Sequence, residues 1–289
     1  MKRYILNRAF FSVIILIVIT VITFFISRVL PGDPVSLWIG GHPTQEQITI
    51  AKKELGLDKP LLTQFVNYSK ELLKGELGTS IRTRQPISSE LKNRFFATFE
   101  LVTISIIISF FIGYPLGLYS GLNEGKRSDK LISRFGYFGL AFPVFWLGMI
   151  LQIIFFSQLN ILPLQGRISQ NIDINALTSG MFLVDSLLKQ NWTVFSNALL
   201  HIILPATTLS FSVVGIILRT SRSSLIDTIS EPYFNTFKTY GLTKKEIVTK
   251  LAYKNTLIPV GTIVGLSYGL MLGGTFLVES IFDWPGLGQ

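Results

Sequence analysis

Long runs of apolar side chains, separated by charged segments, dominate the pattern of this chain. The first run, Ala9–Ser27, contains no ionisable side chain. At about 1.5 Å of rise per residue it would cover about 28 Å as a helix, which is close to the hydrocarbon thickness of a bilayer. Four more uncharged runs follow, at Leu101–Gly121, Phe135–Asn160, Ile202–Leu218 and Asn255–Val278. The pattern predicts an all-α fold, a polytopic transmembrane helical bundle with five spans in this chain.

Lysines and arginines around these runs give the expected orientation. Lys2, Arg3 and Arg8 precede the first run, and basic residues also fill the short segments after the second and fourth runs. Because short cytoplasmic loops carry an excess of such residues, we expect a multi-pass protein of the cell (inner) membrane with a cytoplasmic N-terminus. The first run is too long for a signal peptide and no small-residue cleavage site follows it, so we expect it to remain as a span.

Composition narrows the class of protein. Only 15% of the 289 residues are charged, whereas soluble domains carry about 25%. The net charge of +9 does not indicate nucleic-acid binding, because many basic residues flank apolar runs instead of gathering on one face. The chain has no cysteine, and its two histidines, His42 and His201, lie far apart. We therefore expect no catalytic site, no metal site and no cofactor in this chain.

The segments between the runs suggest three regions. We expect a first transmembrane helix in residues 1–30, an extracytoplasmic helical subdomain in residues 31–97, and a transmembrane core in residues 98–289. The core would include a long cytoplasmic loop at residues 219–256.

The expected subdomain carries helix signals. Thr44 and Gln47 stand at capping-box spacing, and Gly56 can end the helix that they start. A second helix follows Pro60, with one apolar face for the membrane domain or a partner, and plain packing is the interpretation that we favour.

The segment at residues 219–256 has the most informative pattern. Ser230 can cap a helix that Gly241 ends, and Thr243 begins a capping box for a second helix. Aromatic residues fall on one face of the first helix, at Tyr233, Phe234, Phe237 and Tyr240. Burial of this aromatic face would be favourable, and spacing alone leaves open whether it packs against the membrane domain, the lipid interface or a partner.

Glycines recur at every fourth residue in two of the runs. They are Gly113, Gly117 and Gly121 in the second run, and Gly261, Gly265, Gly269 and Gly273 in the fifth. Such stripes let helices approach closely, and we favour tight packing over direct contact with a substrate. A stripe of small residues could also line a path for a large substrate.

Other functions find less support. A secondary transporter would need ionisable groups within the membrane, and the cores of the five runs have none. The segment Gly121–Lys126 has three residues between its glycines, where a phosphate-binding loop needs four. Glu279 and Asp283, near the outer end of the fifth run, are expected to be interfacial. A passive channel or a structural membrane anchor remains as an alternative.

Short motifs follow one another along nearly the whole chain. They include Pro31-Gly-Asp-Pro34, Glu54-Leu-Gly-Leu-Asp-Lys-Pro60, Phe142-Pro-Val-Phe-Trp-Leu-Gly148, His201-Ile-Ile-Leu-Pro205, Arg219-Thr-Ser-Arg222, Lys254-Asn-Thr-Leu-Ile-Pro259 and Trp284-Pro-Gly-Leu-Gly288. In this order they resemble the permease subunits of ABC importers of the dipeptide, oligopeptide and nickel transport family, the B-type inner-membrane component of binding-protein-dependent systems. Members of that family continue into a further transmembrane helix, so we expect a sixth span that is missing here.

The resemblance implies a role for the long cytoplasmic loop. From Glu231 onward the loop resembles the coupling loop of ABC importer permeases, which docks into a groove on the ATPase, although Phe237-Lys-Thr-Tyr240 replaces the small residues of that motif. By this resemblance the ATPase-coupling residues are Glu231, Tyr233, Phe234, Phe237, Lys238, Tyr240, Gly241 and Thr243.

The resemblance also implies partners and cargo. The partners would be a homologous second permease subunit, two ATP-binding subunits and an extracytoplasmic substrate-binding protein, within the lipid bilayer and without nucleic acid. The chain would form the pathway for short peptides or nickel chelates, and oligosaccharides stay open as cargo. ATP hydrolysis would take place on the partner subunits, so the chain itself is not expected to be an enzyme.

Overall fold

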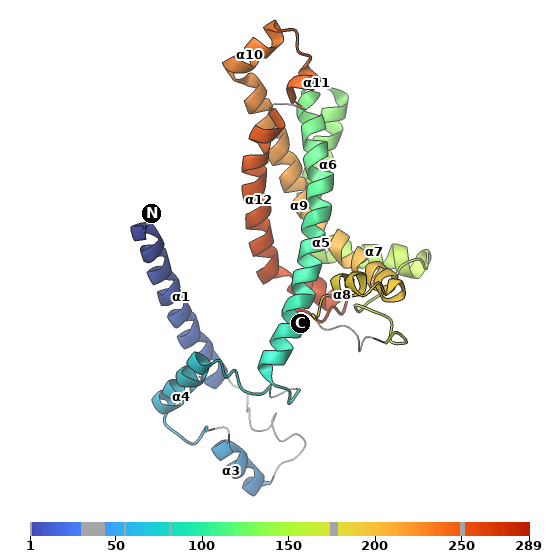
Figure 1. The fold of residues 1–289 in the computed structure, drawn as a ribbon. Helices are drawn as coiled ribbons and strands as arrows, with labels where there is room; N and C mark the ends of the chain where they lie inside the picture. The colour runs from blue at the N-terminus through green and yellow to red at the C-terminus, as the bar shows by residue number, and fades with distance from the viewer. Residues whose placement is uncertain (1, 30–43, 55, 81–82, 174–178, 249–251) are drawn as a thin grey trace. The chain divides into compact units, whose positions relative to one another are not determined.

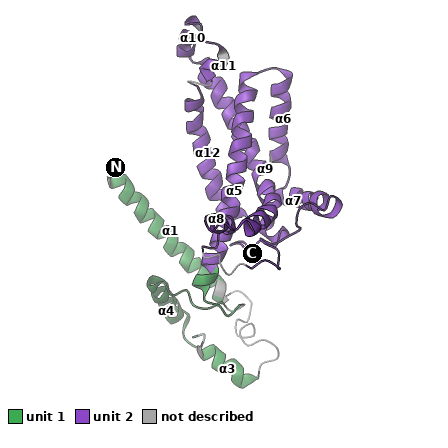
Figure 2. Ribbon diagram, turned by 45° about the vertical axis from the view of Figure 1, so that its right-hand side comes forward, with its two compact units in different colours: residues 1–90 green, residues 91–289 purple. Residues whose placement is uncertain are grey.

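The computed structural model describes residues 2–29, 44–54, 56–80, 83–173, 179–248 and 252–289. These residues form helices and no strand, apart from an isolated bridge between Thr79 and Pro86. They divide into two units, residues 1–90 and 91–289 (Figure 2). The prediction of an all-α polytopic bundle is confirmed, whereas the three regions expected from the sequence stay a prediction.

The first unit joins a long apolar helix to two shorter ones. Its described helices are α1 (Lys2–Val29), α3 (Gln45–Glu54) and α4 (Leu61–Lys74). Phe24 of α1 is only 2% exposed, because its ring packs against the rings of Phe65 and Tyr68 in α4. These contacts hold α4 against the C-terminal part of α1. The motif Pro31–Pro34 and His42 lie outside the described residues.

Both signals predicted around α3 are present. The Thr44 N–H donates to Gln47 Oε1 at 2.9 Å, and the Gln47 N–H donates to Thr44 Oγ1 at 3.4 Å. Gly56 has a φ of 63°, in the left-handed region that favours glycine, and its N–H donates to the Lys53 carbonyl oxygen at 3.2 Å. The capping box and the glycine stop are therefore confirmed, and α4 begins directly after Pro60 as predicted.

The second unit is built from the remaining helices. They are α5 (Ile87–Leu122), which begins just before the boundary, α6 (Arg127–Ala141), α7 (Val144–Gln152), the π-helix η1 (Ile153–Gln158), α8 (Phe182–Leu188), α9 (Trp192–Ser230), α10 (Pro232–Thr239), α11 (Lys244–Ile247), α12 (Tyr253–Gly274) and α13 (Phe276–Ile281). Figures 1 and 2 show α5, α6, α9 and α12 running alongside one another. At one end of this bundle, the α10 end, lie α10 and α11. At the other, the α8 end, lie α7, α8 and the last residues of the chain.

Among the described residues, four helices are long and apolar enough to cross a membrane. They are Arg3–Ile26, Ile87–Leu122, Trp192–Ser230 and Tyr253–Gly274. A fifth span results if α6 and α7 are counted together, but that pair is bent by 98°. The run Phe135–Asn160 is therefore not the single straight helix that its composition predicts. Phe142 is extended there, with φ −88° and ψ 133°, because Pro143 disfavours a helical residue before it and has no N–H to donate.

α9 connects the two ends of the second unit. It contacts α6, α7, α8, α10, α12 and α13. Its side chains enter three buried clusters in turn, with Ile202 and Leu204 nearest the α8 end, Ile217 in the middle, and Leu225 at the α10 end. One continuous helix thus carries packing contacts from α8 to α10.

Candidate functional site

The segment predicted to form a helix, a glycine and a second helix does so. Gly241 stands between α10 and α11 with a φ of 82°, which is the left-handed conformation expected at a helix stop. The Thr243 N–H donates to Glu246 Oε2 at 3.0 Å, and the Glu246 N–H donates to Thr243 Oγ1 at 3.3 Å. The capping box that starts α11 is therefore confirmed.

The start of α10 differs from the prediction. α9 continues through Ser230, whose hydroxyl donates to the Ile226 carbonyl oxygen at 2.8 Å instead of capping α10. Glu231 is extended, with φ −63° and ψ 138°, and Pro232 is the first residue of α10. Proline suits this place, because a first helical residue needs no N–H partner and the residue before a proline avoids the helical region. The predicted Ser230 cap is wrong, and the corner at Glu231 turns the chain from α9 into α10.

The aromatic residues of this segment do not share one environment. Phe234 is 1% exposed and Phe237 is partly buried, and both pack in a cluster with Leu225 of α9 and with apolar side chains of α11. In contrast, Tyr233 is 48% exposed and Tyr240 is 79% exposed. The expectation that all four share one side is wrong, because the adjacent residues Tyr233 and Phe234 point about 100° apart on the helix, and Tyr240 follows Thr239, the last residue of α10. The chain covers the two phenylalanines and leaves the two tyrosines uncovered.

Lys238 belongs to α10, but its side chain lies outside the part that the structure describes. Tyr233 is held at its hydroxyl, which accepts from Asn255 Nδ2 at 3.1 Å. This bond fixes the tyrosine beside the start of α12.

An ion pair joins α6 to α9 near the same end. Arg222 donates from Nε to Asp129 Oδ1 at 2.6 Å and from Nη2 to Asp129 Oδ2 at 2.8 Å. The same carboxylate accepts from the Ser120 hydroxyl at 2.5 Å and from the Gly125 N–H at 2.9 Å. One buried carboxylate therefore ties together α5, the α5–α6 turn, α6 and α9. Gly125 and its neighbours, compared above with a phosphate-binding loop, form part of this turn.

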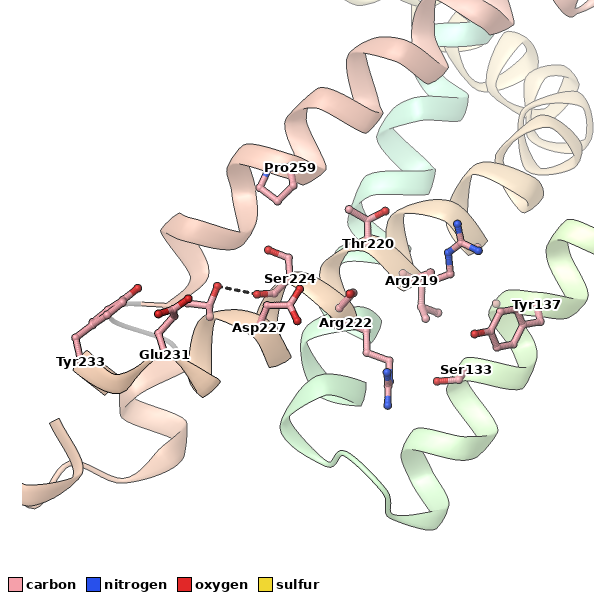
Figure 3. Close-up of a pocket in the computed structure, with 15 residues that line it drawn as sticks. Ser133, Tyr137, Arg219, Thr220, Arg222, Ser224, Asp227, Glu231, Tyr233 and Pro259 are labelled. Atoms are coloured by element: carbon pink, nitrogen blue, oxygen red, sulfur yellow. Dashed lines mark hydrogen bonds between the residues drawn. The ribbon is translucent and has the colours of Figure 1, made fainter. Parts of the chain in front are cut away.

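A pocket of about 850 Å³ opens beside the ion pair, between α6, α9, α10 and α12 (Figure 3). This volume falls in the range of about 300–1,000 Å³ that is usual for small-molecule sites. Tyr137 of α6, Tyr233 of α10 and Pro259 of α12 line it, together with residues of α9 between Gly215 and Thr228. Its charged lining residues are Arg219, Arg222, Asp227 and Glu231. The pocket is therefore polar and carries charges of both signs.

The glycine stripe of α5 lies against α9. A Cβ added to Gly117 would lie 2.6 Å from the Leu218 carbonyl oxygen, and one added to Gly113 would lie 2.9 Å from the Val214 carbonyl oxygen. At Gly121 the nearest atom would be a side-chain carbon of α9 at 3.1 Å. The three glycines of α5 have no side chains, and this lets the two backbones approach closely.

The glycine stripe of α12 has different surroundings. A Cβ added at any of its four positions would meet nothing within 4 Å: Gly261, Gly265, Gly269 and Gly273. Leu266 and Leu270 of the same helix are 60% and 77% exposed. No packing neighbour among the described residues accounts for this stripe.

Buried carboxylates near the α8 end were not predicted, and two of them have well-defined partners. The first, Glu100, is 4% exposed and accepts from Arg167 Nη2 at 2.6 Å and from the Leu183 N–H at 2.7 Å. The Arg167 guanidinium also lies 3.9 Å from the centre of the Phe182 ring. In the sequence Glu100 only borders an uncharged run and Arg167 falls in an irregular segment, so no local signal joins them.

The second carboxylate is Glu279, which was expected to be interfacial. It is fully buried and accepts from the Thr98 hydroxyl at 2.6 Å, the Thr275 hydroxyl at 2.7 Å and the Gly288 N–H at 2.7 Å. Trp284 Nε1 donates to the α5 backbone at 3.0 Å. The interfacial expectation is wrong because the motif at the end of the chain folds back over Glu279 and covers it.

His201 has a backbone partner in its own helix, since its Nδ1 lies 2.8 Å from the Asn197 carbonyl oxygen. Within the described ranges, no group of three or more His, Cys, Asp or Glu side chains could hold a metal ion. The expectation that this chain holds no metal or cofactor stays a prediction.

Comparison with known proteins extends this picture. Residues 113–289 match the family model of the binding-protein-dependent transport system inner membrane component, and residues 1–102 match the N-terminal model of such components. Among curated relatives, "Probable D,D-dipeptide transport system permease protein DdpB" of Escherichia coli (strain K12) is 40% identical, over 98% of this chain and 83% of its own length. The dipeptide transport system permease protein DppB of the same strain is 34% identical, over 100% of this chain and 86% of its own.

A third relative is named for a different substrate. The glutathione transport system permease protein GsiC of Salmonella typhimurium is 33% identical, over 100% of this chain and 85% of its own length. Two family models and these relatives cover the same membrane helices and the same α10–α11 segment that the structure shows. The chain therefore belongs to the permease subunits of binding-protein-dependent ABC importers, in the peptide-transporting family.

Proposed function

We propose that this chain forms the translocation pathway of an ATP-driven importer of short peptides. The relatives support peptide cargo, since their names specify D,D-dipeptides, dipeptides and glutathione. Nickel chelates and oligosaccharides, which the family resemblance also left open as cargo, have no such support. ATP hydrolysis would belong to partner subunits, so the chain would act as a transport subunit and not as an enzyme.

The proposed complex contains a homologous second permease, two ATP-binding subunits and an extracytoplasmic binding protein. The α10 end would face the cytoplasm, because the segment from Arg219 to Lys254 is short and basic. The same rule places the N-terminus in the cytoplasm. The open glycine stripe of α12 would face the second permease or the pathway.

The proposal that α10 and α11 dock on an ATP-binding subunit rests on the exposure of the Tyr240 side chain. Tyr240, directly after the last residue of α10, is 79% exposed, while Phe234 within α10 is 1% exposed. Because Phe234 anchors α10, the residue that directly follows the helix is already held in place, so docking through Tyr240 would cost little conformational entropy, and exposed tyrosines are frequent binding hot spots. Closure of the ATP-binding subunits would then move α10, and through Leu225 it would move α9. Other proposed coupling residues are Glu231, Tyr233, Phe237, Lys238, Gly241 and Thr243.

A pull-down tests this function. The full-length chain, tagged and solubilised from its native membrane, should bring a second permease and ATP-binding subunits with it. Tyr240→Asp should lose the ATP-binding subunits and keep the second permease, because it places an unpaired charge in the docking face. Tyr240→Phe, which keeps the ring, is the matched control and should retain both. Recovery of the chain alone as a stable homo-oligomer would favour the passive channel or the membrane anchor instead.

A further inference from the structure

We infer that the pocket between α6, α9, α10 and α12 is an exit site, which holds the two charged ends of a transported peptide before release. The inference rests on the proposed peptide import, and it names residues of this chain that would receive the substrate. The pocket has the volume of a small-molecule site, and it lies where the α10 end would open to the cytoplasm.

The pocket carries accessible charges of both signs on different sides. Figure 3 shows Arg219 on the side of Tyr137, and Asp227 and Glu231 on the side of Tyr233. All three charged side chains are exposed. Across the described part of the chain, no hydrogen bond or ion pair engages their charged groups. A cation and anions held apart in one pocket match a ligand that has a carboxylate at one end and an ammonium at the other.

Arg222, the other arginine of the pocket, differs because its guanidinium is bound by Asp129. Arg219 is therefore the cation that the pocket offers to a ligand. Arg222 thus serves the structural ion pair with Asp129, whereas Arg219 is proposed to bind the peptide carboxylate.

The spacing along α9 suits a short peptide. Arg219 and Asp227 are eight residues apart, which corresponds to about 12 Å along a helix and places them on neighbouring faces. An extended dipeptide spans about 7 Å and a tripeptide about 10 Å. The long arginine side chain can close the remaining distance, so the site fits zwitterionic peptides of two or three residues.

Exposure of these charges is consistent with release. Interactions between exposed charges are screened by salt and are individually weak. A site that only receives a substrate and passes it to the cytoplasm needs such weak contacts, since tight binding would slow the departure of the peptide.

Photolabelling of the intact importer, reconstituted in lipid nanodiscs with all its subunits, tests the exit site. The probe is the dipeptide L-alanyl-L-p-benzoylphenylalanine, and mass spectrometry locates the labelled residues. Labelling is expected within residues 215–233 or at Tyr137. Excess alanyl-phenylalanine should suppress it, whereas N-acetyl-alanyl-phenylalanine amide, which lacks both terminal charges, should not.

Variants separate recognition from folding. Arg219→Gln should lower labelling about fivefold and remove the preference for a free carboxylate over an amide, whereas Asp227→Asn should remove the preference for a free ammonium over an acetyl group. Arg134→Gln and Glu124→Gln alter exposed charges near the same end that do not line the pocket, and they should label like the wild type. A mere loss of folding would not change one terminal preference and spare the other.

Three results would overturn the exit site. If the wild-type importer transports alanyl-phenylalanine but the probe labels residues elsewhere, such as α12, the exit site is wrong while the proposed function stands. The same holds if labelling is found here but neither variant changes the terminal preferences. If the wild-type importer does not transport the dipeptide at all, the proposed function fails and the exit site fails with it.

Discussion

Gly117 of α5 faces the Leu218 carbonyl oxygen of α9 so closely that an added Cβ would lie 2.6 Å from it. The β-carbon of Ser221 would be equally near. Both obstacles belong to the backbone or to the first atom of a side chain, so neither can move without shifting a helix. The packing of these two long helices therefore depends on a hydrogen atom at position 117.

Gly117→Ala should destabilise the chain by about 1–3 kcal/mol, the usual cost of forcing a methyl group into a packed contact. The loss should appear as a lower midpoint in thermal unfolding of the purified full-length chain in detergent. An unchanged midpoint would show that α5 and α9 separate at no cost.

Gly269 offers the matched control and a prediction of its own. An added Cβ there would meet nothing within 4 Å, so Gly269→Ala should leave the unfolding midpoint unchanged or raise it slightly. Gly269→Leu should likewise preserve the stability of the isolated chain, but it should reduce co-purification of the second permease or peptide uptake if α12 faces either. Normal assembly with normal uptake would argue that lipid covers this stripe.

Local signals in the sequence predict the ends of helices well. The capping boxes that begin at Thr44 and Thr243, and the left-handed stop at Gly241, depend on neighbouring residues only, and the structure contains all three. The corner at Glu231 was missed because Pro232 sets the start of α10 more strongly than the Ser230 hydroxyl can, through its missing N–H and its effect on Glu231.

Whether a helix face is buried depends on residues that are distant in the sequence. The spacing of Phe234 and Tyr240 placed them together, but the position of α9 and α11 decides that one is buried and the other exposed. Glu279 was missed for the same reason, since its partner Thr98 is far away in the sequence and only the fold brings them together. The hydropathy of a run reflects the average environment of its residues. It does not reveal a single buried carboxylate whose hydrogen-bond donors come from other parts of the chain.

Glu279 leads to a third prediction. Glu279→Ala removes the acceptor of two hydroxyl groups and one backbone N–H in a site closed to water, and each unsatisfied buried group costs about 1–3 kcal/mol. Thermal unfolding should show a loss of more than about 2 kcal/mol. Asp283→Asn, at an exposed carboxylate four residues further on, keeps a side chain suited to the local φ of 45° and an oxygen that can accept from Gln289 Nε2, so it should change stability by less than about 0.5 kcal/mol. Equal effects of the two variants would contradict the structural role of Glu279.

The ion pair of Asp129 and Arg222 leads to the last prediction, which concerns coupling. Asp129 holds α5, α6 and their turn to α9, and α9 continues to the corner from which α10 departs. If ATP-driven closure moves α10, this carboxylate makes the α5–α6 pair move with α9 as one body.

Asp129→Asn keeps the shape of the side chain but loses the charge that binds both guanidinium nitrogens. In the reconstituted importer it should therefore leave the ATP-binding subunits attached while lowering peptide uptake per ATP hydrolysed. Lys130→Gln alters the exposed neighbour and should leave that ratio unchanged. A normal ratio in Asp129→Asn would mean that α9 moves without α5 and α6, and that the ion pair serves stability alone.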